Sequence, residues 1–273
     1  MDQFKDKVAI ITGGASGIGR ALSQTLCQSG ARVVVADSNG EGAQNVASGL
    51  NQAGGRAEGV ALDVSRAEDV QKLIAETVAK HERLDYMFNN AGITIAGEVR
   101  DMDLDHWQRV IEVNLRGVIY GSTTAYTVMV EQGFGHIVNI ASLAGLIGYP
   151  INTPYATTKY AVVGLSTSLR AEGEELGVKV SVVCPGYVQS NIYYATPVLQ
   201  ADIPDPLAAI PFKPMDTAKA AQIILRGVAR NHRFIVFPFY ARLLWWLYRL
   251  HPALLAPLDR QTVTEFRAIR RDE

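Results

Sequence analysis

The chain has 273 residues, a formal net charge of −1 and 48% hydrophobic residues. A chain of this length can bury one substantial core, and we predict a single domain over residues 1–273. The near-neutral charge, with no basic stripe, excludes a nucleic-acid partner. Only Cys27 and Cys184 are present and no cleavable signal peptide precedes the first predicted strand, which favours a cytoplasmic protein with reduced thiols. The five histidines lack metal-ligand spacing, so no catalytic metal is expected.

The first predicted elements are a strand, a glycine-rich turn and a helix. Residues 7–12 form a nearly all-apolar, β-branched run, typical of a strand buried on both faces of a parallel sheet. Gly13, Gly17 and Gly19 follow at once, and the apolar pattern over residues 18–26 predicts a helix. Glycines permit close approach to a pyrophosphate, and a helix N-terminus favours an anion. An ordinary glycine-rich turn is the alternative, but this order of elements favours a dinucleotide site.

A second predicted strand, residues 31–36, ends at Asp37, about 20 residues after the glycines. An acidic side chain at this position accepts hydrogen bonds from a ribose 2′-hydroxyl and repels a 2′-phosphate. Neither Ser16 in the glycine loop nor Ser38 after the strand supplies a positive charge for that phosphate. The predicted cofactor is therefore NAD rather than NADP.

Three polar residues further along predict acid/base chemistry. Tyr155 and Lys159 are four residues apart, so on a helix they project a phenol and an ammonium from the same face. The Lys159 cation is expected to lower the pKa of Tyr155 and so favour the phenolate. The Ser142 hydroxyl, thirteen residues before the tyrosine, can hydrogen-bond the reacting oxygen of a substrate.

Together with further motifs, these features resemble the short-chain dehydrogenase/reductase family from about residue 7 to about residue 238. In chain order the motifs are Thr-Gly-x-x-x-Gly-x-Gly at residues 12–19, Asp63-Val64, Asn89-Asn90-Ala91-Gly92, Asn114, Ser142, Tyr155 with Lys159, and Pro185-Gly186. The resemblance implies a Rossmann-type, doubly wound α/β fold with a seven-stranded parallel sheet in the order 3-2-1-4-5-6-7. It also implies an oxidoreductase that acts on a CH–OH group.

The resemblance assigns roles position by position. The implied catalytic residues are Asn114, Ser142, Tyr155 and Lys159. The implied cofactor-binding residues are Gly13, Ser16, Gly17, Ile18, Gly19, Asp37, Asp63, Val64, Asn90, Ala91, Gly92, Tyr155, Lys159, Pro185, Gly186, Val188 and Ser190. Asp63 and the Val64 backbone would hold the adenine, and Asn114 would lie in a helix distortion. The alternative for Asp63 is a cap on the helix that begins near Ser65.

The remaining strands are expected at residues 56–62, 84–88, 136–140, 179–184 and 234–237. They alternate with helical patterns, which predicts right-handed crossovers and a parallel sheet with helices on both faces. Long apolar helices at about 104–132 and 153–176 resemble the pair that forms subunit interfaces in the family. We therefore expect a homodimer or homotetramer.

The substrate is expected to be a hydrophobic secondary alcohol or its ketone. Residues 188–215 are predicted to form a lid, whose apolar members include Ile192, Tyr193, Tyr194, Val198, Leu199, Leu207, Ile210 and Phe212. Loops expected beside it contain Ile93, Thr94, Ile95, Leu143, Ala144, Ile147, Tyr149 and Ile151. A polar or anionic substrate would need cationic or amide partners, which are few here. The alternative is that these side chains only pack the lid.

Residues 239–273 form an unusually apolar and aromatic tail, too short and too interrupted by arginines and Pro252 for a membrane span. Three hypotheses stay open: the tail covers an active site of its own or a neighbouring subunit, makes an oligomer contact, or lies on a membrane surface. Two alternative functions also remain. One is an NADPH-dependent ketone reductase; the other is a catalytically silent dinucleotide-sensing or membrane-associated protein.

Overall fold

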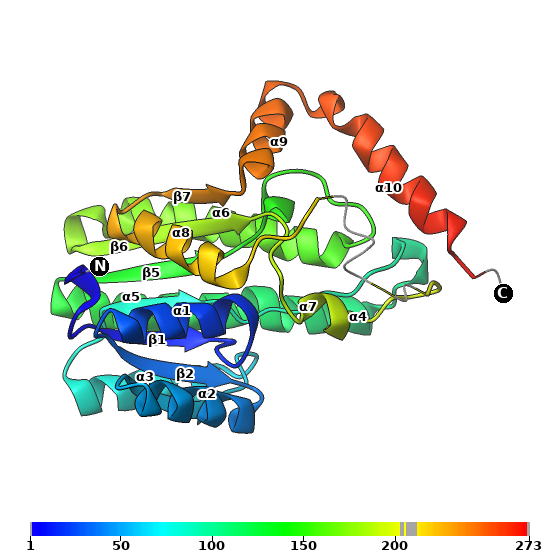
Figure 1. Cartoon of the computed structure of the whole chain (residues 1–273). Helices are drawn as coiled ribbons and strands as arrows, with labels where there is room; N and C mark the ends of the chain where they lie inside the picture. Colours follow the sequence, from blue (N-terminus) through cyan, green and yellow to red (C-terminus); the bar gives the residue numbers. More distant parts are fainter. Residues whose placement is uncertain (1, 203–204, 206–211, 272–273) are drawn as a thin grey trace.

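The computed structural model describes residues 2–202, 205 and 212–271. Its centre is a seven-stranded, all-parallel sheet in the order β3-β2-β1-β4-β5-β6-β7 (Figure 1). The strands are β1 Val8–Thr12, β2 Arg32–Asp37, β3 Arg56–Ala61, β4 Tyr86–Asn89, β5 Gly135–Ile140, β6 Val178–Pro185 and β7 Phe234–Phe237. The predicted Rossmann-type sheet and its strand order are confirmed.

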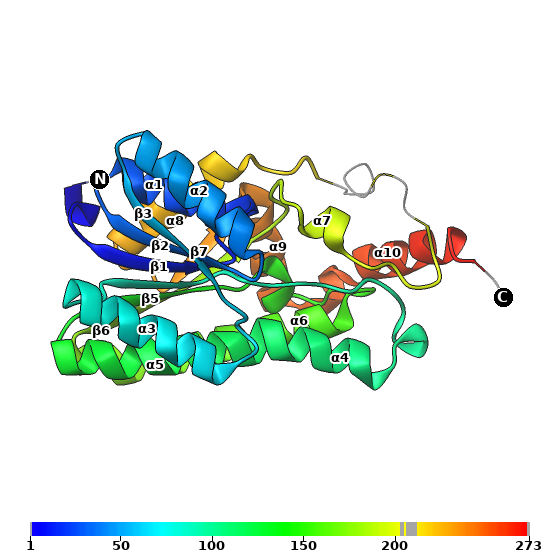
Figure 2. The same cartoon turned by 90° about the horizontal axis from the view of Figure 1, so that it is seen from below.

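The helices form two layers, one on each face of the sheet, which Figure 2 shows from below. One layer contains α1 Gly17–Gln28, α2 Gly40–Gln52 and α8 Thr217–Ala229, whose apolar side chains share a core with β1 and β2. The other contains α3 Ala67–His81, α5 Gly117–Gln132 and α6 Thr153–Gly173. Because both faces are covered, every residue of β1 is buried, as its uninterrupted apolar sequence requires.

The long helix expected over 104–132 is interrupted. It consists of α4 Leu104–Ile111, one π-helical turn at Glu112–Arg116 and then α5. The helix expected over 153–176 is α6 followed by a short 3-10 turn, Glu174–Leu176. A π-turn is a local irregularity that is often found at functional sites, and this one carries Asn114.

Three helices lie in the segments that were expected to form the lid and the tail. These are α7 Ile192–Ala195, α9 Phe239–Leu250 and α10 Ala256–Ala268. Among the described residues, no helix is long and apolar enough to cross a bilayer. Cys27 and Cys184 are both buried and free, as predicted.

A buried histidine in β5 is expected to make the fold sensitive to acid. His136 is 4% exposed, with Nε2 2.9 Å from Ser181 Oγ, and burial lowers its pKa to about 3, assisted by the charges of Lys179 and Arg170. Its pKa in the unfolded chain is about 6.5, so between these values the unfolded state binds more protons, and stability falls as the pH falls. From pH 7 to about pH 4.5, urea unfolding should show the wild type losing about 2–3 kcal/mol more than His136→Gln. If both proteins lost the same free energy of unfolding, the lowered pKa of His136 would not be the cause of the acid sensitivity.

Candidate active site

The glycine loop between β1 and α1 has a backbone that requires glycine. Gly13 and Gly17 have φ angles of +64° and +52°, in the left-handed region. A Cβ on Gly19 would lie 2.1 Å from the Gly13 carbonyl oxygen. The Ser16 side chain makes no capping hydrogen bond to the first turn of α1, and this turn contains partly buried Ile18. The loop therefore presents its backbone next to the N-terminus of α1. Backbone N–H groups in such a place bind the negative charge of a pyrophosphate.

The ends of β1 and β4 are joined by a hydrogen-bond network around Thr12. Its Oγ1 accepts from the backbone N–H groups of Asn90 at 3.0 Å and Ala91 at 3.1 Å. The Asn90 side-chain amide donates to the carbonyls of Thr12 at 2.9 Å and Gly13 at 3.1 Å. Asn90 and Ala91 are thereby fixed against the glycine loop. Thr12 was not predicted as a site residue, although its place at the start of the glycine motif was a signal.

The carboxylate of Asp37, at the end of β2, reaches back to the glycine loop. Oδ2 accepts from the Ala15 N–H at 3.0 Å and Oδ1 from the Asn39 N–H at 2.9 Å. This places a negative charge beside the loop, where a 2′-phosphate would be repelled.

Asp63 and Val64 have local structural contacts. Asp63 Oδ1 accepts from the backbone N–H and the hydroxyl of Ser65, and these hydrogen bonds lower its pKa. The Val64 side chain is buried, and a Cβ on Gly117 would lie 2.9 Å from it. Asp63 therefore orders the turn that precedes α3, but it does not cap that helix, whose N-cap residue is Arg66.

Ser142, Tyr155 and Lys159 meet at the carboxyl end of β5. Ser142 follows the strand, and its side chain hydrogen-bonds that of Tyr155 on α6. One turn further along α6, Lys159 is 3% exposed. Its Nζ donates to the Ile140 carbonyl at 2.9 Å and lies 5.3 Å from the centre of the Tyr155 ring. The i,i+4 spacing therefore does place the phenol and the ammonium together.

Asn114 lies in the π-helical turn and is completely buried. Its side chain accepts from the Ile93 N–H and donates to the Ile93 carbonyl, both at 2.8 Å. A Cβ on Gly92 would lie 3.3 Å from Asn114 Oδ1 and 3.5 Å from Lys159 Nζ. Gly92 therefore lies against both Asn114 and Lys159, and the predicted helix distortion at Asn114 is present.

The pKa values of this cluster differ from expectation. Burial raises the pKa of Tyr155, and the hydrogen bond from Ser142 opposes the rise without cancelling it. Burial lowers the pKa of Lys159 to about 8. At Tyr155 desolvation outweighs the lowering of the pKa that was expected from Lys159. The physical reason is that the ammonium is bound to the Ile140 carbonyl and lies over the tyrosine ring, while desolvation dominates both groups.

The segment after β6 closes back onto the glycine loop. Pro185 ends β6, and the Gly186 N–H donates to the Phe237 carbonyl at 2.7 Å. Val188 is buried and bridges to Met215 in the manner of a short strand. A Cβ on Gly17 would lie 3.1 Å from the Ser190 Cβ, so Ser190 adjoins the start of α1.

Several aromatic side chains gather beside Tyr155. The Tyr149 hydroxyl donates to the Tyr187 hydroxyl at 2.9 Å, and the Tyr187 N–H donates to the Tyr240 hydroxyl at 2.6 Å. Burial raises the pKa values of Tyr149 and Tyr193, and the neighbouring Tyr155 raises both further. Sequence reasoning did not assign Tyr187 to the site and placed Tyr240 only in the tail. The signal for Tyr187 was its position directly after Pro185-Gly186.

The tail packs onto the segments that surround this aromatic group. Phe266 and Val263 of α10 share an apolar cluster with Ile151 and with Val198 of the expected lid. Tyr240 and Leu255 pack in the core cluster that includes Leu143 and Ile147, just after Ser142. In this chain the tail therefore packs on segments that adjoin its own candidate active site. Two residues of the expected lid, Leu207 and Ile210, lie outside the described residues.

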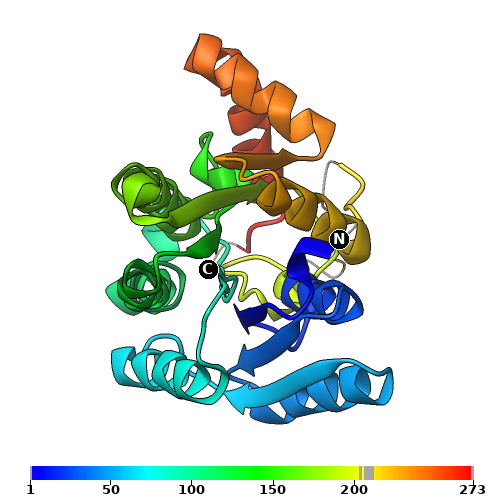
Figure 3. The ribbon, with the colours of Figure 1, turned by 90° about the vertical axis from the view of Figure 1, so that its left-hand side faces the viewer.

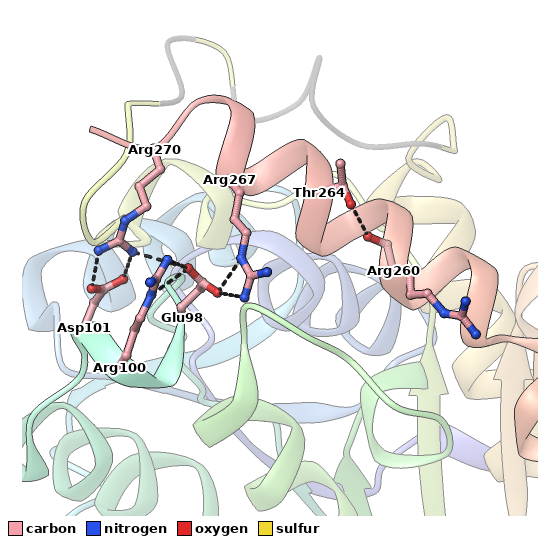
Figure 4. A network of polar contacts seen from close by, with 7 residues as sticks. All are labelled: Glu98, Arg100, Asp101, Arg260, Thr264, Arg267 and Arg270. Atoms are coloured by element: carbon pink, nitrogen blue, oxygen red, sulfur yellow. Dashed lines mark hydrogen bonds and ion pairs between the residues drawn. The ribbon is translucent and has the colours of Figure 1, made fainter. Parts of the chain in front are cut away.

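A network of ion pairs fastens α10 in this position (Figure 4). Arg267 donates to Glu98 at 2.6 Å and 2.9 Å, and Arg270 is paired with Asp101 and Glu98. Arg100 adds a third arginine to Glu98. The side chain of Glu98 is 10% exposed, and hydrogen bonds from Arg267 and Arg100 lower its pKa. The chain end is thus held to the loop after β4 by charge as well as by apolar packing.

The geometry fits a nicotinamide dinucleotide. The glycine loop provides the close backbone approach and helix N-terminus that a pyrophosphate needs, and Asp37 provides an acceptor for a ribose hydroxyl. The Ser142–Tyr155 pair lies at the carboxyl edge of the same parallel sheet, where ligands of such folds bind. Together the fold and the site define an oxidoreductase of the dinucleotide-binding class.

The chain belongs to the short-chain dehydrogenase family, whose model matches residues 7–196. It is 38% identical over 192 residues to an uncharacterised oxidoreductase of Staphylococcus aureus strain USA300, covering 70% of this chain and 82% of that protein. It is 38% identical over 202 residues to the 2,5-dichloro-2,5-cyclohexadiene-1,4-diol dehydrogenase of Sphingobium indicum, covering 73% and 77%. The crystal structure of the apo form of LigD from Sphingobium sp. strain SYK-6 superposes with a TM-score of 0.78 and 30% identity, covering 90% of this chain and 96% of that one.

Proposed function

We propose that this protein interconverts a hydrophobic secondary alcohol and its ketone with NAD as cofactor. The observation that carries the proposal is the cluster of Ser142, Tyr155 and Lys159 at the sheet edge beside the glycine loop. The family uses nicotinamide dinucleotides, either NAD or NADP. The choice of NAD rests on Asp37, whose carboxylate is held at the loop by the Ala15 N–H.

The chain's own residues supply proton transfer and positioning. In the oxidative direction Tyr155 would act in its phenolate form and take the proton from the substrate hydroxyl, while Ser142 hydrogen-bonds the same oxygen and orients it. Lys159 would hold the nicotinamide ribose, and Asn114 fixes the loop that contains Ile93. NAD would supply the acceptor for the hydride of the carbinol carbon, so that the products are the ketone, NADH and the proton held on Tyr155.

The substrate class follows from the side chains around Tyr155. Tyr149, Tyr187 and Tyr193 present aromatic faces with a few hydroxyl groups. Such a lining favours a bulky alicyclic or aryl alcohol over an anionic substrate. The named activity of the Sphingobium indicum relative, on a cyclic diol, supports this class.

Replacing Asp37 with serine is expected to lower the preference for NAD over NADP by about 10- to 100-fold, because it removes the ribose acceptor and the repulsion of a 2′-phosphate. The measurement is NADH or NADPH formation across secondary alcohols from small and polar to steroidal and aryl, with both cofactors in parallel. Glu41→Ser is the matched control, since it removes an exposed acid from α2 and leaves Asp37 in place. A wild type that prefers NADP, or small polar alcohols, would contradict the corresponding half of the proposal.

A further inference from the structure

Helix α9 stands out from the sheet edge formed by β7, with one apolar face turned away from the protein. It projects beyond the rest of the molecule in two perpendicular views (Figures 1 and 3). Its inner face packs in a core cluster through residues that include buried Ala241 and partly buried Leu244, Trp245 and Leu247. The opposite face carries Phe239, Leu243, Trp246 and Leu250, which are 79%, 44%, 61% and 64% exposed.

These four residues form one continuous stripe. Their spacings of four, three and four residues place them on a single side of the helix. Leu254 and Leu258, 49% and 41% exposed, extend the apolar surface beyond the end of α9. Single exposed apolar residues are ordinary, but a contiguous stripe with an aromatic residue at its centre marks an interaction surface.

All Asp, Glu, Lys and Arg residues from Lys219 to Arg249 are positive, and Asp259 is the first acidic residue after them. Between Asp216 and Asp259 the sequence contains no aspartate or glutamate. The same stretch contains Lys219, Arg226, Arg230, Arg233, Arg242 and Arg249. The chain as a whole carries a net charge of −1, so this part is strongly polarised relative to the rest. The Arg249 guanidinium lies 5.4 Å from the centre of the Trp245 ring, beside the stripe.

We propose that α9 docks this protein on an anionic lipid surface, with Phe239, Leu243, Trp246 and Leu250 entering the headgroup boundary and the arginines contacting the lipid phosphates. A helix of 12 residues is too short to span a bilayer and suits a position along its surface. Arginine and tryptophan are the side chains favoured there, because both combine an apolar body with a polar end.

A second copy of the chain is the competing occupant. A two-fold contact would place the stripe against itself, and would bring Arg242 and Arg249 of one copy toward the same residues of the other. Such juxtaposed like charges oppose association, whereas an anionic membrane neutralises them. The charge pattern therefore favours lipid.

Flotation of the purified full-length protein with lipid vesicles tests the proposal without any assay of activity, so it is independent of the proposed function. The wild type is expected to float with phosphatidylcholine vesicles that contain about 30% phosphatidylglycerol, and about tenfold less with phosphatidylcholine alone. Trp246→Glu should lower binding by about tenfold, and raising the salt concentration from about 0.05 M to 0.5 M should weaken wild-type binding. Leu104→Glu, which makes the same kind of change at an 84% exposed site on α4, should bind as the wild type does.

Sedimentation of the same proteins without lipid separates the two occupants. If the wild type fails to float at low salt, the proposal is overturned. If, in addition, Trp246→Glu converts an oligomer to monomers, a second copy of the chain covers the stripe. Equal loss of binding in Trp246→Glu and Leu104→Glu would also overturn it. The salt dependence of wild-type binding keeps the test valid if a variant does not fold.

Discussion

Replacing Tyr155 with phenylalanine is expected to lower kcat by about 10²- to 10⁴-fold while leaving dinucleotide binding nearly unchanged. The substitution removes the phenol oxygen that is hydrogen-bonded to Ser142, and it retains the ring over which the Lys159 ammonium lies at 5.3 Å. Proton transfer is therefore lost, while the position of Lys159 and the glycine loop is kept. Steady-state kinetics combined with calorimetric titration of NAD measures the two effects separately.

Tyr160→Phe is the matched control for this variant. Tyr160 is the next tyrosine on α6 and is 41% exposed, and its side chain hydrogen-bonds Tyr248 of α9 instead of Ser142. Turnover close to that of the wild type is expected. If Tyr155→Phe instead lost NAD affinity together with turnover, Tyr155 would serve to hold the cofactor, and its assignment as acid and base would fail.

Replacing Gly19 with alanine is expected to lower kcat/KM by about 100-fold and to cost about 1–3 kcal/mol of stability. The new Cβ would lie 2.1 Å from the Gly13 carbonyl oxygen and 2.6 Å from the Asn90 amide nitrogen. A backbone oxygen cannot move aside as the end of a flexible side chain can, so the glycine loop must shift away from its position beside α1. Urea unfolding and NAD titration measure the two consequences.

Gly49→Ala provides the comparison, because Gly49 lies within α2 and a Cβ there would have no atom within 4 Å. An alanine in an open helical position lowers the entropy of the unfolded chain, so a gain of about 0.4–1 kcal/mol is expected with unchanged NAD affinity. If the two substitutions had the same effect, close packing at Gly19 would not be the reason for a glycine at that position.

The sheet was predictable because strands buried on both faces leave continuous apolar runs in the sequence. All seven predicted strands are present, with ends that differ by at most two residues. The largest difference is at the start of β4, which was expected at Leu84. That side chain is buried, but its N–H is bonded to the Gln132 side chain at 2.8 Å, so the ladder begins later. Burial alone predicts an apolar residue but not its hydrogen-bond partner.

The proximity of Tyr155 and Lys159 could be predicted from helix periodicity, but their pKa values could not. The helix spacing sets the distance between the two side chains. Whether the ammonium acts on the phenol oxygen depends on the Ile140 carbonyl, which belongs to another element. The depth of burial, which dominates both pKa values, is likewise a property of the assembled fold.

The position of the tail had no local signal in the sequence. Glu98 and Arg267 are 169 residues apart, and nothing near either residue distinguishes it from other charged residues on the surface. The apolar pattern of residues 239–273 allowed three hypotheses, and only the fold showed that Phe266 packs against Ile151. These contacts between distant segments could therefore not be predicted from the sequence, and only the structure revealed them.

The fastening of α10 to Glu98 and Asp101 has a consequence for how this protein can diversify. The residues proposed for hydride transfer lie within the stretch that matches the family model, 7–196, whereas α10 and the part of the lid it contacts at Val198 follow it. The acidic residues that hold α10, Glu98 and Asp101, lie inside the family-matched stretch, whereas Arg267 and Arg270 lie outside it. An exchange of the tail alone would therefore leave these acids without their arginines, so the two parts of the chain are constrained to change together.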